Sequence, residues 1–323
     1  MLRHFLLALA LVLSASPLLA QTYRWPCNDS LDPLLSILVE WSAECDSSLD
    51  YGFVVSVTGA GLSVAYDPAT GLTMAPRQKL LWPGNAFIAL DSTYVPLIPR
   101  NWNEAESLLV QGMDSRTRQL LYGPEPVVLT GVDTSFGPPW FFVSMCDSAG
   151  AISAIWDRSD FLRTWWRWAD LPGANSIWPM PQATTTRLGR RVVHACMRHL
   201  VLAARPDSLG KQHFGLSALA AAQLYLDLPP GSPKALRQMA GLRAAAADFL
   251  ERAVDLWPPA KREPVRLASF FLQKDSEAWL TLAAVSGTWT SYDAGQRAEW
   301  LVRLADWETK AAVALDQIVS KAE

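Results

Sequence analysis

The sequence lacks the short motifs that mark common catalytic and nucleotide-binding sites. Its 323 residues contain no GxSxG nucleophile elbow, no HExxH zinc motif, no Walker A loop, no GxGxxG loop and no EF-hand loop. The sequence therefore points to no cofactor and to no particular catalytic residue. Paired carboxylates that lie far apart in a chain leave no such motif, so the question of an enzymatic activity stays open.

An excess of basic charge is also lacking. Lys and Arg together number 28, Asp and Glu number 31, and the formal net charge is -3. Proteins that bind nucleic acid usually carry a basic surface, so nucleic acid is not expected as a ligand. The hydrophobic fraction of 50% is that of a folded chain rather than a disordered one.

Cysteine is scarce, and no two of the four cysteines form a CxxC pair. The sequence thus supports neither a zinc ribbon nor a thioredoxin-type redox motif. Four cysteines allow three disulfide pairings. We predict a disulfide between Cys27 and Cys45, which closes a short loop, and we keep buried free thiols as the alternative.

A possible metal site at His194, Cys196 and His199 is not favoured. On a helix Cys196 and His199 share a face, whereas His194 points elsewhere, and zinc or haem needs more convergent ligands than two. No metal is expected. We interpret His199 as a buried histidine with a hydrogen-bond partner.

One unbroken apolar run stands out at the N-terminus. Arg3 precedes nine apolar residues at 5–13, and Pro17 and Ala20 follow them. This is the three-part pattern of a secretory signal peptide, with cleavage expected after Ala20. The run is shorter than the roughly 20 apolar residues that cross a membrane, and no later segment is long enough. We therefore expect a mature chain without a transmembrane segment, in the periplasm of a bacterium or secreted.

The remaining chain changes character near residue 185. Strand and turn patterns prevail before it, and helical periodicity prevails after it. We predict an α+β fold with a signal peptide at 1–20, an N-terminal mixed strand and helix domain at 21–182, and a C-terminal antiparallel α-helical bundle at 183–323. The predicted strands are 53–57, 62–66, 72–74, 86–90, 127–130, 140–146 and 151–156. The predicted helices are 32–43, 104–121, 159–169, 188–204, 212–226, 233–257, 263–285 and a last helix after Asp293.

Two segments resemble parts of known families. The segment from Leu34 to Tyr51, a helix followed by Leu49-Asp50-Tyr51, resembles small domains of secretin and pilus-assembly proteins, in which a helix precedes short strands. The resemblance covers a short part of the chain, carries no functional residue across and assigns no family. Ser208 and Lys211 match the SxxK motif of penicillin-binding proteins and β-lactamases. No KTG strand follows it, so we interpret it as a chance match.

The sequence is rich in tryptophan, with 15 residues, of which five lie between 156 and 178. We define the N-terminal Trp cluster as Trp156, Trp165, Trp166, Trp168 and Trp178, together with the flanking cations Arg163 and Arg167. Three tryptophans on one short helix cannot all face the same core, so at least one is expected at a surface. Tryptophan is enriched in binding hot spots. The cluster is therefore our predicted binding site for a protein or a glycan, with a sealed junction between domains as the alternative.

These observations favour an exported, non-catalytic cell-envelope protein. We expect it to act through protein–protein binding, for example as an accessory of a secretion, pilus or conjugation apparatus. The alternative is a cell-wall or glycan-binding protein, or a hydrolase, that uses an exposed Trp-lined surface. That alternative requires an open groove with tryptophan walls and at least one carboxylate.

Overall fold

The computed structural model describes residues 32–46, 48–75, 79, 81–90, 95–114, 118–123, 125–135, 137–147, 150–170, 173–180 and 188–320. The predicted signal peptide and Cys27 lie outside these residues, so the cleavage site and the Cys27–Cys45 disulfide stay predictions. The predicted α+β fold is confirmed, since two antiparallel sheets accompany a C-terminal run of long helices. No helix among the described residues is long and apolar enough to span a membrane.

The chain divides into two compact units. The first comprises Met1–Glu40 and Tyr94–Gln182, and the second comprises Trp41–Thr93 and Ala183–Glu323. The first division falls inside α2 (Pro33–Cys45), and the last falls where the sequence changes character. The predicted domains meet at residue 182. The two units share that boundary, but Trp41–Thr93 belongs to the same unit as the C-terminal helices.

The first unit is built on a five-stranded antiparallel sheet in the order β6-β5-β4-β3-β7. Its strands are β3 (Gln119–Leu121), β4 (Val127–Asp133), β5 (Trp140–Asp147), β6 (Gly150–Trp156) and β7 (Ile177–Pro179). Strands β4, β5 and β6 follow one another through tight antiparallel pairings, such as Phe141 with Trp156. Three of these strands, β4, β5 and β6, were predicted from their alternating patterns.

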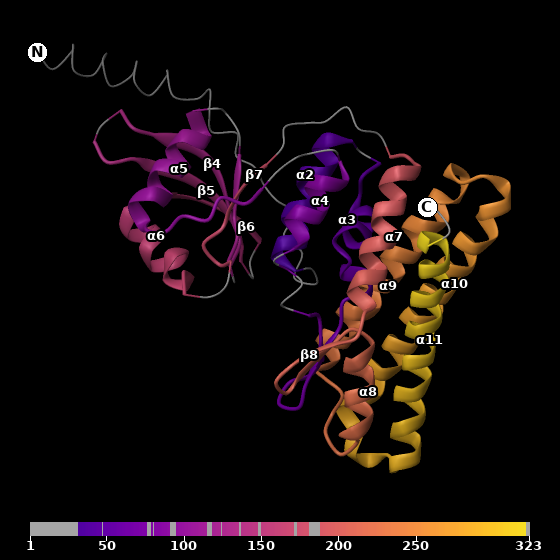
Figure 1. The fold of residues 1–323 in the computed structure, drawn as a ribbon. Helices are drawn as coiled ribbons and strands as arrows, with labels where there is room; N and C mark the ends of the chain where they lie inside the picture. Colours follow the sequence, from indigo (N-terminus) through magenta and orange to yellow (C-terminus); the bar gives the residue numbers. More distant parts are fainter. Residues whose placement is uncertain are drawn as a thin grey trace, which may run out of the picture. The chain divides into compact units, whose positions relative to one another are not determined.

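Helices α5 (Trp102–Asp114) and α6 (Arg158–Thr164) pack beside this sheet (Figure 1). Phe161 of α6 lies at the centre of the core, with its ring centroid 4.9 Å from Phe141 and 5.0 Å from Trp156. Asp157 and Asp160 form a reciprocal capping box that starts α6. The short 3-10 helix η3 (Trp166–Trp168) follows. The predicted helix at 104–121 is too long, because its last three residues form β3.

The second unit is a helical bundle. Figure 1 shows α7 (Arg190–Ala204), α9 (Pro233–Ala253), α10 (Pro259–Val285) and α11 (Ala294–Ser320) as long helices that run side by side. The shorter α8 (Leu216–Leu224) joins α7 to α9. Pro233 starts α9 as predicted, whereas α10 starts at Pro259, before the predicted start at 263. Asp293 and Gln296 cap α11 reciprocally.

Helix α3 (Tyr51–Thr58) replaces the predicted strand at 53–57, so that prediction was wrong. The Asp50 side chain accepts a hydrogen bond from the Phe53 N–H and caps the helix, and Gly59 ends it with a φ of 81°. A short apolar run that is buried all round does not reveal its period, and this run packs as a helix against α7 and α9. The resemblance to secretin domains implies a strand at this point, and the structure has a helix instead.

Glycines allow this close packing of α3. A Cβ atom added at Gly52 would lie 2.8 Å from the carbonyl oxygen of Ala245 in α9, and one added at Gly59 would lie 2.7 Å from that of His199 in α7. Both distances are shorter than real Cβ contacts. Helix α3 is thus part of the core of the helical bundle.

A second predicted strand was also wrong. Residues 86–90 belong mostly to α4 (Trp82–Ala89), where Pro83 occupies the first turn and Phe87 packs edge-on against Trp41 at 4.7 Å. The predicted strand at 62–66 is largely the 3-10 helix η1 (Ala60–Leu62) and a loop, and only its end enters a strand.

A small sheet completes the second unit. Its order is β2-β1-β9-β8, with β1 (Ala65–Asp67), β2 (Gly71–Thr73), β8 (Asp207–Leu209) and β9 (Gln212–Phe214). Ser208 and Lys211 lie at the tip of the β8–β9 hairpin, which turns at Gly210 with a φ of 60°. Because Ser208 does not open a helix, the geometry of an SxxK catalytic serine is absent here.

Candidate functional site

The N-terminal Trp cluster does not form one surface. Trp156, Trp165 and Trp178 are buried, with exposed fractions of 6%, 1% and 5%. Trp165 also donates a hydrogen bond from its indole nitrogen to the carbonyl oxygen of Tyr122, 2.9 Å away. Trp156 and Trp165 belong to the hydrophobic core of the first unit. Trp166 and Trp168 are half-buried, so only they and the two arginines remain available for the predicted binding role.

The two arginines of the cluster have local partners. Arg163 is exposed and pairs with Asp160 at 2.7 Å. The Arg167 guanidinium lies 4.6 Å from the centroid of the Trp168 ring and 3.5 Å from a carboxylate oxygen of Glu125. This stacking covers one face of Trp168. A ligand here competes with interactions that the chain already makes.

His199 of α7 has a structural role. The Nδ1 atom of His199 lies 2.5 Å from the carbonyl oxygen of Val57, so the ring donates its proton to α3. Burial first, and the nearby Arg198 charge, lower the pKa of His199, so the ring is neutral at pH 7. The hydrogen bond expected for His199 is present, and the side chain is half-buried rather than fully buried. Cys196 is buried, and its burial raises the pKa of the thiol.

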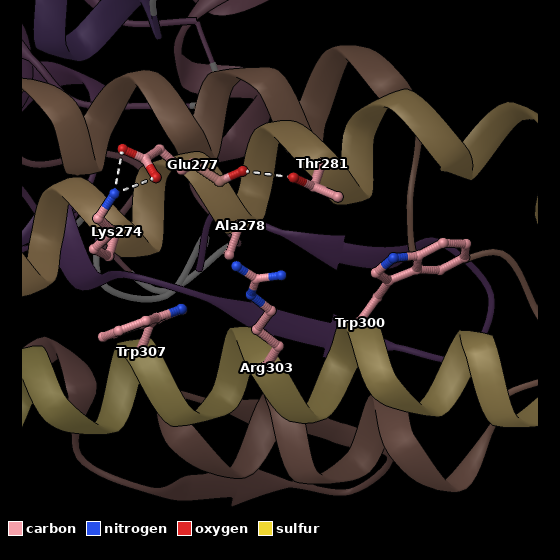
Figure 2. Close-up of a pocket in the computed structure, with 7 residues that line it drawn as sticks. All are labelled: Lys274, Glu277, Ala278, Thr281, Trp300, Arg303 and Trp307. Carbon is pink, nitrogen blue, oxygen red and sulfur yellow. Dashed lines mark hydrogen bonds and ion pairs between the residues drawn. The ribbon is translucent and has the colours of Figure 1, made fainter.

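A different site lies between α10 and α11. We define the α10–α11 pocket by its seven lining residues, which enclose about 260 Å³. They are Lys274, Glu277, Ala278 and Thr281 from α10, and Trp300, Arg303 and Trp307 from α11 (Figure 2). On each helix these residues recur at intervals of three and four, which places them on one face.

The α10 wall is polar and internally paired. The Lys274 ammonium lies 2.8 Å and 3.1 Å from the two carboxylate oxygens of Glu277. The Thr281 hydroxyl donates to the backbone oxygen of Glu277 at 2.9 Å. The charges of Lys274 and Glu277 therefore offset each other, and this wall adds little net charge to the pocket.

The α11 wall consists of two half-buried indole rings with an exposed arginine between them. Trp300 is supported from behind by Tyr292, edge-on at 4.7 Å, and by the buried Trp289 at 5.9 Å. The Lys310 ammonium lies 4.5 Å from the centroid of the Trp307 ring and pairs with Asp306 at 2.6 Å. Arg303 makes no ion pair with any residue that the structure describes.

Both indole nitrogens lie on the Arg303 side of their rings (Figure 2). Neither donates a hydrogen bond to any residue in the described part of the chain. Three donor groups on α11, from Trp300, Arg303 and Trp307, therefore face the same space without an acceptor. A site with this imbalance favours a ligand that is rich in acceptors or negatively charged.

A buried ionic cluster lies on the other side of the same two helices. Asp275 follows Lys274 in α10, Glu308 follows Trp307 in α11, and Arg243 of α9 joins them; all three side chains are 0% exposed. Arg243 Nη2 lies 2.5 Å from Glu308 Oε1, and Arg243 Nε lies 3.3 Å from Asp275 Oδ2. The Trp279 indole donates to Glu308 at 3.3 Å.

The two carboxyl groups of this cluster take different protonation states. Burial, and then the Glu308 charge, raise the pKa of Asp275 well above its ordinary value. Burial alone would raise the pKa of Glu308 too, but the Arg243 charge and hydrogen bonds hold it below its ordinary value. Burial thus favours a protonated Asp275, whereas the Arg243 charge favours an ionised Glu308. The cluster joins α9, α10 and α11 through one side chain each, and so links the two helices that line the pocket to α9.

Within the described ranges no group of three His, Cys, Asp or Glu side chains is arranged to hold a metal ion. No protein-family model matches the chain, and a comparison with curated proteins finds no match.

The sequence carried a signal for this pocket. Trp300, Arg303 and Trp307 are spaced at three and four residues on the last helix, beside the buried stripe that contains Leu301 and Leu304. An aromatic stripe next to the core stripe of an amphipathic helix indicates a second contact surface. The predicted binding site instead followed the higher concentration of tryptophan at 156–178, which lies in the first unit.

Proposed function

We propose that this protein is exported to the bacterial periplasm or the cell exterior and acts there by binding another protein. One example of such a role is that of an accessory protein of a secretion, pilus or conjugation apparatus. The N-terminal signal pattern supports export. The observation that carries the binding role is the α11 wall, where Arg303 stands unpaired between the half-exposed rings of Trp300 and Trp307. Trp and Arg are the residue types most enriched in binding hot spots.

The geometry of the pocket favours binding over catalysis. A hydrolase of glycosides needs two carboxyl groups across the scissile bond. Glu277 is the single carboxylate in the lining, and it is already paired with Lys274. The buried pair of Asp275 and Glu308 is fully enclosed and has no access to a substrate.

Glycan binding is the second candidate. The pocket combines two tryptophans with one carboxylate, which are the features that a Trp-lined glycan surface requires. Its ring faces are partly occupied, however, since Lys310 covers Trp307 and Tyr292 abuts Trp300. Binding of the purified protein to soluble cell-wall fragments, with loss on Trp307→Ala, would move this candidate ahead of the first.

Photo-crosslinking in the native cell envelope tests the proposed function. A photoreactive residue is placed at Thr281, which is exposed in the pocket, and in a matched control at Arg237, which is exposed on α9 outside it. We expect the first position to capture a defined envelope protein, and we expect Trp307→Ala in the same chain to abolish that capture. Equal capture from both positions, or none from Thr281, would contradict the proposal.

A further inference from the structure

The polar atoms of the α10–α11 pocket are unequally distributed between donors and acceptors. Arg303 offers five N–H groups and the two indoles offer one each, whereas the Glu277 carboxylate is engaged by Lys274. A ligand that fills this space needs acceptors, and the unpaired Arg303 charge favours an anion. The planar guanidinium fork matches a carboxylate in particular. The whole chain carries a formal charge of -3, so its net charge does not explain an anion site, which depends on the unpaired Arg303 alone.

The rings of Trp300 and Trp307 each have a neighbour that takes up part of their surface. The Lys310 ammonium covers the Trp307 ring, and Tyr292 meets Trp300 at an interplanar angle of 90°. Stacking of a sugar ring requires a free face. Apolar side chains of a peptide can pack against the exposed parts of these rings without displacing either neighbour, so the geometry favours a peptide over a glycan.

The positions of the three side chains along α11 determine how far apart the contacting groups of a ligand must be. Trp300, Arg303 and Trp307 lie three and four positions apart on α11, which places the two rings about 10 Å apart along the helix axis. A second helix repeats these same intervals on one of its faces. Side chains on one face of an extended peptide are instead about 7 Å apart, or about 13 Å for the next one along, and neither spacing matches the rings. A helix packed along two neighbouring helices is also a recurrent mode of peptide recognition.

We propose that the α10–α11 pocket binds an acidic amphipathic helix of the partner protein. One Asp or Glu of that helix binds Arg303 and receives the two indole N–H groups, and apolar side chains three and four positions to either side pack on the rings. The apolar contact continues along α10, where Phe270 is 50% exposed and Leu267 is 44% exposed. This inference rests on the proposed function, since it names the kind of protein segment that the same pocket binds.

Synthetic helical peptides test this inference with the purified full chain. The first peptide carries Glu with Leu at the positions three and four away, in an Ala and Gln background, and a fluorescent label for anisotropy. Matched peptides replace Glu with Gln or with Lys, or replace both Leu with Ser. We expect the Glu peptide to bind about tenfold more tightly than the Gln peptide, and more weakly as salt rises. Equal affinity for the Glu and Gln peptides would overturn the inference.

Charge reversal in the protein provides the decisive comparison. Arg303→Glu should lose the Glu peptide and gain the Lys peptide, whereas Arg237→Glu, with the same change of charge on α9, should leave both affinities unchanged. Arg303 is exposed, so its replacement leaves the fold intact, and a circular dichroism spectrum checks this. A variant Arg303→Glu that binds the Glu peptide as the wild type does would contradict the proposal.

The outcomes separate this inference from the proposed function. Capture from Thr281 of a partner whose crosslinked segment lacks an acidic residue would overturn the acidic helix and leave protein binding intact. Absence of a captured partner, combined with pocket-dependent binding of wall fragments, would overturn both. Binding of the Glu peptide that is lost in Arg303→Glu and retained in Arg237→Glu would support the acidic helix.

Discussion

Arg243 and Glu308 form a fully buried ion pair between α9 and α11, with 2.5 Å between Nη2 and Oε1. Neither side chain reaches water, and the Arg243 guanidinium also lies 4.9 Å from the centroid of the Trp279 ring. The desolvation of a buried pair offsets much of its attraction, so the pair by itself adds little stability. Its main effect is on specificity, because only one register of the three helices brings the charges together.

Removal of one partner should therefore be costly. In Glu308→Gln the buried Arg243 charge loses its nearest carboxylate and keeps only Asp275, whose charged form is disfavoured by burial. The expected loss is about 3–5 kcal/mol in the free energy of unfolding. Chemical denaturation followed by circular dichroism measures it. A loss below about 1 kcal/mol would show that the cluster is reached by water or rearranges.

Asp275 should make stability depend on pH. Its pKa is raised above the ordinary value of 3.8 in the folded state. Between 3.8 and the folded pKa the native state holds a proton that the unfolded state has released, so stability falls as pH rises through this window. Asp275→Asn keeps the neutral form at every pH. Its stability relative to the wild type should therefore increase between pH 4 and pH 8, as measured by denaturation at both values, and parallel curves would count against a protonated Asp275.

A pair of glycine variants tests the position of α3 in the bundle. Gly52→Ala introduces a Cβ 2.8 Å from a backbone oxygen of α9, and we expect a loss of about 1–3 kcal/mol. Gly241→Ala in the exposed face of α9 meets nothing within 4 Å. It should gain about 0.5–1 kcal/mol, since Ala favours a helix. If both variants gain stability, α3 does not pack where the structure places it.

Elements whose ends are marked by proline, glycine or helix-capping residues were predictable from the sequence. The start of α9 follows from Ser232 and Pro233, and the hairpin of β5 and β6 follows from alternating apolar residues. Helix α3 was not predictable in this way, because its apolar side chains are buried all round and their order carries no period. Whether such a run becomes a helix depends on the distant surfaces of α7 and α9.

The candidate site was only partly within reach of sequence reasoning. The tryptophans at 156, 165 and 178 are core residues because strands and helices far apart in sequence close around them, and composition does not reveal that burial. Arg243 offered a clearer signal, since it lies on the apolar stripe of α9, three or four positions from Met239 and Ala246. A charge within a core stripe predicts buried partners on neighbouring helices.

Capture of partners from the cell envelope, measured for two double variants, tests the central claim most directly. One variant is Trp300→Ala with Trp307→Ala in the α10–α11 pocket, and the other is Trp166→Ala with Trp168→Ala, the half-buried members of the N-terminal Trp cluster. We predict that the first loses the protein captured by the tagged wild type and that the second retains it. Retention by the pocket variant, with loss in the cluster variant, would contradict the account and return the binding site to the first unit.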